Sequence, residues 1–177
     1  MNPWYLDIET TSLYADTGML VCAVLRQGDR DSSFFVDSPK RERGCLRRLL
    51  KRLGRCNELV TFNGKSFDVP FIVSRALVLG IDNPWVEVGL HIDLYEECKR
   101  ILRFDSNNLD HIARTLGIEV KSDMRGNDVP RLYIEYLSTR ERSIKERLIA
   151  HCVQDVDTLQ RLFSKLQPII FREGSCL

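Results

Sequence analysis

Residues 4–11, with the sequence WYLDIETT, place two carboxylates two positions apart in an otherwise apolar segment. Side chains alternate across a β-strand, so Asp7 and Glu9 would lie next to each other on one side of it. Neighbouring carboxylates repel and are costly to bury, and both costs fall when they share hard divalent cations such as Mg²⁺ or Mn²⁺. The segment therefore predicts a metal site, with an ordinary edge strand that has one wet face as the alternative.

Asp68 is the next candidate acid. It begins a predicted helix over residues 68–79, just past a predicted strand over residues 58–62. Ligand sites of α/β proteins gather beyond the carboxyl ends of strands, so this position suits a metal ligand. Aspartate is also favoured as a helix cap, and capping is the alternative interpretation.

His151 and Asp155 lie four residues apart in a long predicted helix over residues 140–166 and so share one face of it. Asp155 is the candidate ligand. Asp157 points about 200° away and is expected to face solvent. A packed or hydrogen-bonded histidine is the alternative reading of His151.

The elements that must position these side chains follow from hydrophobic periodicity and turn residues. Three strands joined by turns come first and predict an antiparallel meander, and strands then alternate with helices, which predicts an α/β fold with a mixed sheet flanked by helices. The predicted strands are 4–11, 19–25, 33–36, 58–62 and 90–94; the predicted helices are 39–55, 68–79, 94–102, 107–116, 129–137 and 140–166, with a loop over 122–128.

Length and composition limit the function classes. The 177 residues suit one domain, and no apolar run approaches the roughly 20 residues of a membrane span. The N-terminus lacks the features of a secretory signal, so we expect a cytoplasmic protein. No Cys-x-x-Cys pair occurs, which argues against structural zinc and a disulfide framework. The cysteines are Cys22, Cys45, Cys56, Cys98, Cys152 and Cys176.

Positive charge is concentrated in one segment. The net charge is only +1, but residues 39–55 contain eight basic residues and the single acid Glu42, giving +7 there and about −6 elsewhere. Leucines in this segment recur at helical spacing, so it predicts an amphipathic helix with a basic outer face. That face is either merely solvated or contacts phosphates; the lack of interleaved aromatic residues favours contact with the backbone over base stacking.

Taken together, Asp7-Ile8-Glu9, the segment from Asn63 to Asp68, and His151-x-x-x-Asp155 resemble the three exonuclease motifs of the DEDD 3′–5′ exonucleases. Within that superfamily the chain is most similar to YprB-like ribonuclease-H-like domains, in which residues 125–133 also have a counterpart. The resemblance covers residues 4–166. It implies a ribonuclease-H-like fold with a mixed five-stranded sheet, forming a single exonuclease domain over residues 1–177.

The resemblance also implies a site and an activity. It places Asp7, Glu9, Asp68 and Asp155 around two divalent ions, Mg²⁺ or Mn²⁺, that cut the phosphodiester bonds of DNA or RNA from a single-stranded 3′ end. It suggests Asn63, Lys65 and Arg125 as substrate contacts, and it identifies no protein partner.

His151 differs from the family pattern. Tyrosine-type members carry their tyrosine four residues before the last aspartate, and histidine-type members carry their histidine five before it. His151 has the tyrosine offset, so the resemblance leaves open whether it orients the attacking water or contacts the phosphate. Two other functions remain: a ribonuclease H or structure-specific endonuclease, and a non-catalytic domain that binds nucleic acid or protein.

Overall fold

Five strands form one mixed sheet in the order β3-β2-β1-β4-β5. The computed structural model describes residues 2–84, 88–121 and 124–172. β1, β2 and β3 pair antiparallel, and β4 and β5 add on the other side of β1 in parallel. The meander and the mixed five-stranded sheet are therefore confirmed. The strands are β1 (Trp4–Thr10), β2 (Leu20–Gln27), β3 (Arg30–Phe35), β4 (Glu58–Thr61) and β5 (Leu90–Asp93).

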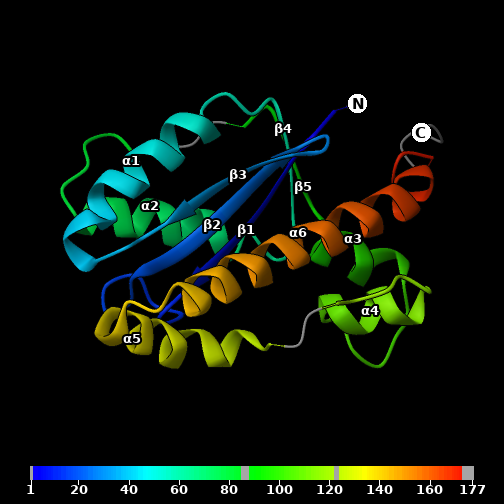
Figure 1. Ribbon diagram of the computed structural model, residues 1–177. Helices are drawn as coiled ribbons and strands as arrows, with labels where there is room; N and C mark the ends of the chain where they lie inside the picture. Colours follow the sequence, from blue (N-terminus) through cyan, green and yellow to red (C-terminus); the bar gives the residue numbers. More distant parts are fainter. Residues whose placement is uncertain (1, 85–87, 122–123, 173–177) are drawn as a thin grey trace.

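Helices cover both faces of the sheet (Figure 1). Two successive residues of β1, Trp4 and Tyr5, contact helices on opposite faces of the sheet. Arg52 of α1 lies over the Trp4 ring, whereas Tyr5 packs edge-on against Phe163 of α6. Thus α1 and α6 lie on opposite faces. The helices are α1 (Glu42–Leu53), α2 (Asp68–Val78), α3 (Leu94–Ile101), α4 (Leu109–Thr115), α5 (Val129–Thr139) and α6 (Arg142–Ile170), with short 3-10 helices η1 (Pro39–Arg41) and η2 (Gly126–Asp128).

The core lies between the sheet and these two helical layers. Residues 20–25 of β2 are fully buried because helices cover both sides of the strand, which explains their continuous apolar run. One face of α6 is also buried: Leu148, Cys152, Val156, Leu159, Phe163 and Leu166. Among the described residues, no helix has the length and apolarity of a membrane span.

Some predicted boundaries shift for local reasons. α6 begins at Arg142 and not at residue 140, because Arg140 adopts a left-handed conformation with φ 60° that ends α5. α4 begins at Leu109, after the Asn108 side chain accepts a hydrogen bond from the His111 amide. Of the predicted loop, residues 122–123 lie outside the described residues and Gly126–Asp128 forms η2.

Five cysteines are free and buried, and Cys176 lies outside the described residues. They act as small core residues, with one exception at the candidate site.

A buried ion pair ties α1 to α2 and β2. The Glu42 carboxylate, 1% exposed, accepts hydrogen bonds from the Arg75 guanidinium at 2.8 and 2.9 Å and from the Leu20 amide at 2.8 Å. Since both of its oxygens are engaged in the interior, the single acid of α1 does not neutralise the cations on the surface of that helix.

Candidate active site

Acidic side chains from three distant segments meet at the carboxyl end of β1. Pairing between β1 and β4 covers only Trp4 and Tyr5 of β1, so the following β1 residues run beside an opening. A cleft of about 570 Å³ lies there, between the sheet, α6 and α4. The sequence-predicted residues that line it are Asp7, Glu9, Asp68, Arg125, His151 and Asp155.

These carboxylates are largely removed from water. Asp68 is 4% exposed and Glu9 is 8% exposed. Burial raises the pKa of Asp68 to about 7 and that of Asp155 to about 7. Burial, and then the charge of Glu9, raises the pKa of Asp7 well above its usual range. Groups that repel one another in this way gain stability from bound cations.

His151 lies among the acids and does not pack in the apolar core. Its Nε2 is 3.3 Å from Glu9 Oε1 and 3.8 Å from Asp155 Oδ2. Glu9, His151 and Asp155 each offer a ligand atom within 4.8 Å of the others, which is the convergence that a metal ion requires. Oxygen donors from the carboxylates suit Mg²⁺ or Mn²⁺, so the residues present fit the expected ions.

Asp68 is held by the backbone as well as by α2. It is the first residue of that helix, after Phe67, so it is not the helix cap that was the alternative reading. The backbone N–H groups of Asp68 and Ile8 lower the pKa of this carboxyl, against the larger effect of burial. The Asp68 side chain thus faces β1 beyond the residues that pair with β4.

The turn before Asp68 depends on Asp93, which the sequence reading missed. This carboxylate, 1% exposed, accepts hydrogen bonds from the backbone amides of Asn63 at 2.7 Å, Lys65 at 2.9 Å and Tyr95 at 3.0 Å. Asn63 has φ 63°, and a Cβ on Gly64 would lie 2.5 Å from the Thr61 side chain. The sequence does contain a signal that could have found Asp93, namely an acid at the end of a predicted strand, directly before a predicted helix.

Cys152 is the second residue that the sequence reading missed. Its Sγ lies 3.1 Å from Asp7 Oδ2 and 3.3 Å from the Asp7 carbonyl oxygen. Burial raises the pKa of the Cys152 thiol, so it keeps its proton and can donate to the carboxylate. The sequence marked this residue only as part of the apolar face of its helix.

Of the three predicted substrate contacts, the structure places one in the cleft and two outside it. Arg125 lines the cleft, together with Asn108 and Asp110, and the charge of Asp110 adds to the raised pKa of Asp155. Lys65 does not line it, and its Nζ pairs with Glu96 at 2.7 Å. Asn63 is also outside the lining and contributes its backbone to the turn.

Asp157 points away from Asp155, as expected, and its side chain is 37% exposed. Its carboxylate lies 3.3 Å from Arg26 Nη1 of β2 and 3.0 Å from Arg161 Nη2. The side chain is therefore partly solvated and also pairs with two cations.

Known proteins show the same fold and sequence pattern. The profile of the RNase_H superfamily, a group of nuclease-type hydrolases, matches residues 4–167. The uncharacterized protein YprB of Bacillus subtilis is 24% identical over 181 residues, covering 98% of this chain and 44% of YprB. DNA polymerase 1 of Sulfolobus acidocaldarius is 29% identical over 134 residues, covering 62% of this chain and 15% of the polymerase.

A solved structure agrees in fold. The family B DNA polymerase from the hyperthermophilic archaeon Pyrobaculum calidifontis superposes with a TM-score of 0.76 at 20% identity, over 93% of this chain and 24% of the polymerase. The chain spans less than half the length of each of these relatives. The profile match over nearly the whole chain shows that it belongs to the RNase_H superfamily.

Proposed function

We propose that this chain is a metal-dependent 3′–5′ exonuclease that hydrolyses the phosphodiester bonds of DNA or RNA. The observation that carries the proposal is the convergence of four acids and His151, from three distant segments, in one cleft at the end of β1. The similarity to parts of DNA polymerases supports a nucleic-acid substrate.

In this proposal Asp7, Glu9, Asp68 and Asp155 hold two divalent ions. Such ions, when bound, lower the pKa of the attacking water and stabilise the leaving 3′ oxygen. The carboxylates supply fixed oxygen ligands, and their burial in a cleft excludes bulk water, which strengthens the attraction to cations. RNase H-like nucleases generally use divalent metals, in agreement with the donor set found here.

His151 is proposed to act on the attacking water. Its imidazole lies 3.3 Å from Glu9, so a water held near that carboxylate would be within reach of Nε2. A neutral imidazole can orient such a water and accept its proton. Arg125 lines the same cleft and is proposed to contact the substrate phosphate.

Digestion of single-stranded DNA and RNA carrying a 5′ label tests the activity and its direction. With Mg²⁺ or Mn²⁺ we expect a ladder that shortens from the 3′ end, and no cleavage in EDTA or by the Asp7→Asn variant. A 3′-terminal phosphorothioate, which resists hydrolysis, should block the reaction. Internal cuts at discrete positions would instead indicate an endonuclease, and activity that survives both EDTA and Asp7→Asn would place the chemistry elsewhere.

Two wider expectations stay predictions. The single exonuclease domain over residues 1–177 and the cytoplasmic location both rest on the sequence alone. The match to YprB covers 44% of that protein, so it does not test either prediction.

A further inference from the structure

The cations of η1, α1 and the residues just after α1 form a surface that the proposed reaction does not use. Arg43 donates to the Gly80 carbonyl and Arg52 lies over Trp4, but the other six cations of this segment are exposed. Among the described residues, no side chain of these six forms a hydrogen bond or an ion pair with another residue. We call this set the basic surface: Lys40, Arg41, Arg47, Arg48, Lys51 and Arg55.

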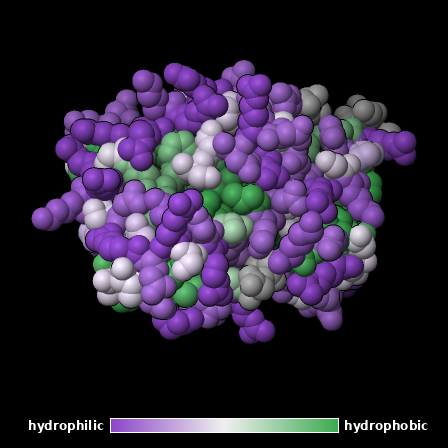
Figure 2. Space-filling view, in the orientation of Figure 1, coloured by the Kyte–Doolittle hydropathy of each residue, from purple (hydrophilic) through white to green (hydrophobic). Residues whose placement is uncertain are grey.

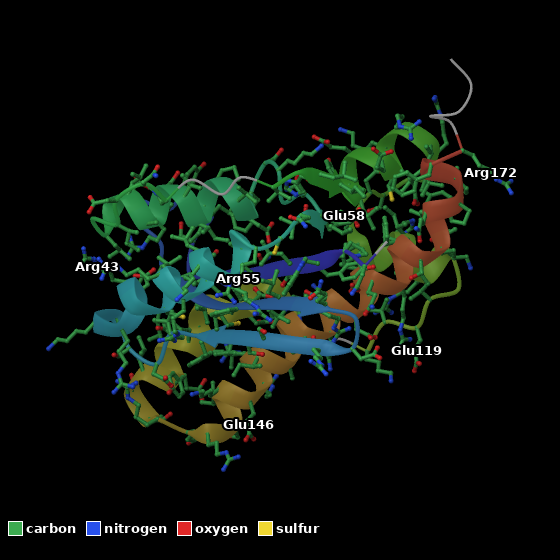
Figure 3. The ribbon with its side chains drawn as sticks, turned by 90° about the horizontal axis from the view of Figure 1, so that it is seen from above. Arg43, Arg55, Glu58, Glu119, Glu146 and Arg172 are labelled. Atoms are coloured by element: carbon green, nitrogen blue, oxygen red, sulfur yellow. The ribbon has the colours of Figure 1, made fainter. Side chains whose placement is uncertain are left out.

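The basic surface lies apart from the cleft. α1 covers the sheet face that carries Trp4, whereas Asp7 and Glu9 alternate to the face covered by α6. In Figure 3, which looks down on α1, Arg43 and Arg55 mark the two ends of this helix, and the surface over α1 is strongly hydrophilic in Figure 2. A polymer held in the cleft reaches this surface only after it passes around the sheet.

Spacing on the basic surface matches a polyanion. Arg47 and Lys51 are one turn apart, a rise of about 6 Å, and Arg55 follows just beyond the end of the helix. This is shorter than the Debye length of about 8 Å in physiological salt, so the cations repel one another when nothing is bound. A row of phosphates would turn that repulsion into attraction.

One end of the basic surface is hollowed. Lys40, Arg41 and Arg48 line a depression of about 330 Å³ together with Phe35, Asp37 and Gly44. The single carboxylate in this lining, Asp37, is paired with Lys145 at 2.6 Å. The depression therefore presents three cations and a neutralised acid, a setting suited to a phosphate group.

We propose that the basic surface binds the sugar-phosphate backbone of a nucleic-acid segment outside the catalytic cleft. Arginine supplies four of the six cations, and its planar fork fits phosphate oxygens in pairs. Residues 39–55 expose no large apolar side chain, because the leucines of α1 face the core, so the surface lacks the anchors of a membrane-inserting helix or a protein interface.

The proposal rests on the proposed function in one respect, that the substrate is nucleic acid, and it predicts a dependence on length. An oligonucleotide of about 6 nucleotides can occupy only the cleft, whereas one of about 30 nucleotides can also follow the basic surface. Longer substrates should bind more tightly, and the gain should depend on salt.

Fluorescence anisotropy in EDTA measures binding without hydrolysis. We expect Arg47→Glu/Arg48→Glu/Lys51→Glu to weaken binding of the 30-nucleotide DNA or RNA at least about tenfold and to reduce the slope of log Kd against log salt by about 2 to 3, with little change for the 6-nucleotide one. The matched control reverses three exposed arginines elsewhere, Arg131, Arg142 and Arg161, and should bind like the parent. Circular dichroism checks that both variants fold.

Three results would overturn the proposal: an unchanged affinity and salt slope in the α1 variant, an equal loss in the control variant, or competition by poly-glutamate as effective as that by nucleic acid at equal charge. Because these measurements need no catalysis, they remain decisive if the chain proves not to cleave nucleic acid. Conversely, if the basic surface does not bind nucleic acid, the proposed reaction in the cleft is not affected.

Discussion

The surroundings of His151 make its proposed role in the reaction testable. Its Nε2 faces Glu9 and Asp155, so a change at this position acts on the water and the phosphate more than on the core. If the imidazole orients or deprotonates the water, His151→Ala should lower kcat by roughly 10²- to 10⁴-fold. Calorimetric titration with Mn²⁺ serves as the second measurement, because a loss confined to kcat separates catalysis from metal binding.

The substitution His151→Tyr sharpens that test. The tyrosine-type relatives carry their tyrosine at this offset, so activity above that of His151→Ala would show that a polar group at this position supports the reaction. Turnover by His151→Ala close to that of the parent would make the histidine structural.

Cys152 is a positioning residue in this arrangement, since it contacts the Asp7 carboxylate through its thiol. Cys152→Ala removes that hydrogen bond and should weaken Mn²⁺ binding by about 10- to 100-fold, the usual effect of losing a group that orients a metal ligand. Cys152→Ser keeps a donor at the same place and should restore most of the affinity. Equal losses in both variants would show that the thiol contributes packing and not orientation.

Residue types and spacing in the sequence identified four acids of the cleft, Asp7, Glu9, Asp68 and Asp155, because strand alternation and helical periodicity are local properties. The roles of Asp93 and Cys152 were missed because they depend on long-range contacts. Each acts on a residue at least 28 positions away, through a contact that only the folded chain creates.

At the scale of elements, the order of strands and helices follows from the sequence, while their ends depend on single residues. A left-handed conformation at Arg140 separates α5 from α6, and such a conformation is uncommon for arginine, so the helix predicted from periodicity over residues 140–166 began two residues before the observed start at Arg142. The early separation of β1 from β4 likewise has no local signature, although it creates the opening in which the acids meet.

The turn between β4 and α2 offers a prediction at this scale. Asp93→Ala leaves the amides of Asn63, Lys65 and Tyr95 without their acceptor, and unsatisfied buried donors cost about 1 to 3 kcal/mol each. We expect the free energy of unfolding to fall by about 2 to 4 kcal/mol in urea titrations. The nuclease rate should fall as well, because the turn sets the start of α2 and therefore the place of Asp68.

Glu96→Ala is the matched control for that experiment. It removes the exposed partner of Lys65 from the neighbouring helix and should change stability by less than about 1 kcal/mol. An Asp93→Ala protein as stable as this control would contradict the structural role of the turn.

For the whole molecule, the buried acids couple stability to pH and to metal. The folded pKa of Asp68 and of Asp155 is about 7, whereas an unfolded aspartate titrates near 3.9. These groups bind protons more tightly in the folded state, so their contribution to stability is complete below about pH 3.9 and is lost as the pH rises through about 7. Their ionised forms are what a cation stabilises.

In EDTA we therefore expect Tm to fall between about pH 5 and about pH 8, and we expect Mn²⁺ to raise Tm more at the higher pH. The control is Asp155→Asn, which carries no charge to bury and should show a smaller fall with pH and a smaller gain from Mn²⁺. Differential scanning fluorimetry measures both. A Tm in EDTA that rises over this pH range, with no metal effect at either end, would contradict the model of a buried anionic cluster.

The Ile8 amide, which lowers the pKa of the Asp68 carboxyl, gives this strand an unusual reporter. Most strand amides are protected from deuterium exchange by a neighbouring carbonyl, and their exchange rates report how often the sheet opens. Ile8 instead lies beyond the residues of β1 that pair with β4, and its amide faces a side chain whose pKa is about 7 and which is proposed to bind metal. The protection factor of this amide would consequently follow proton and metal occupancy of the cleft while the protection factors of the rest of β1 stay unchanged, so a single backbone position can report the state of the site without any substrate.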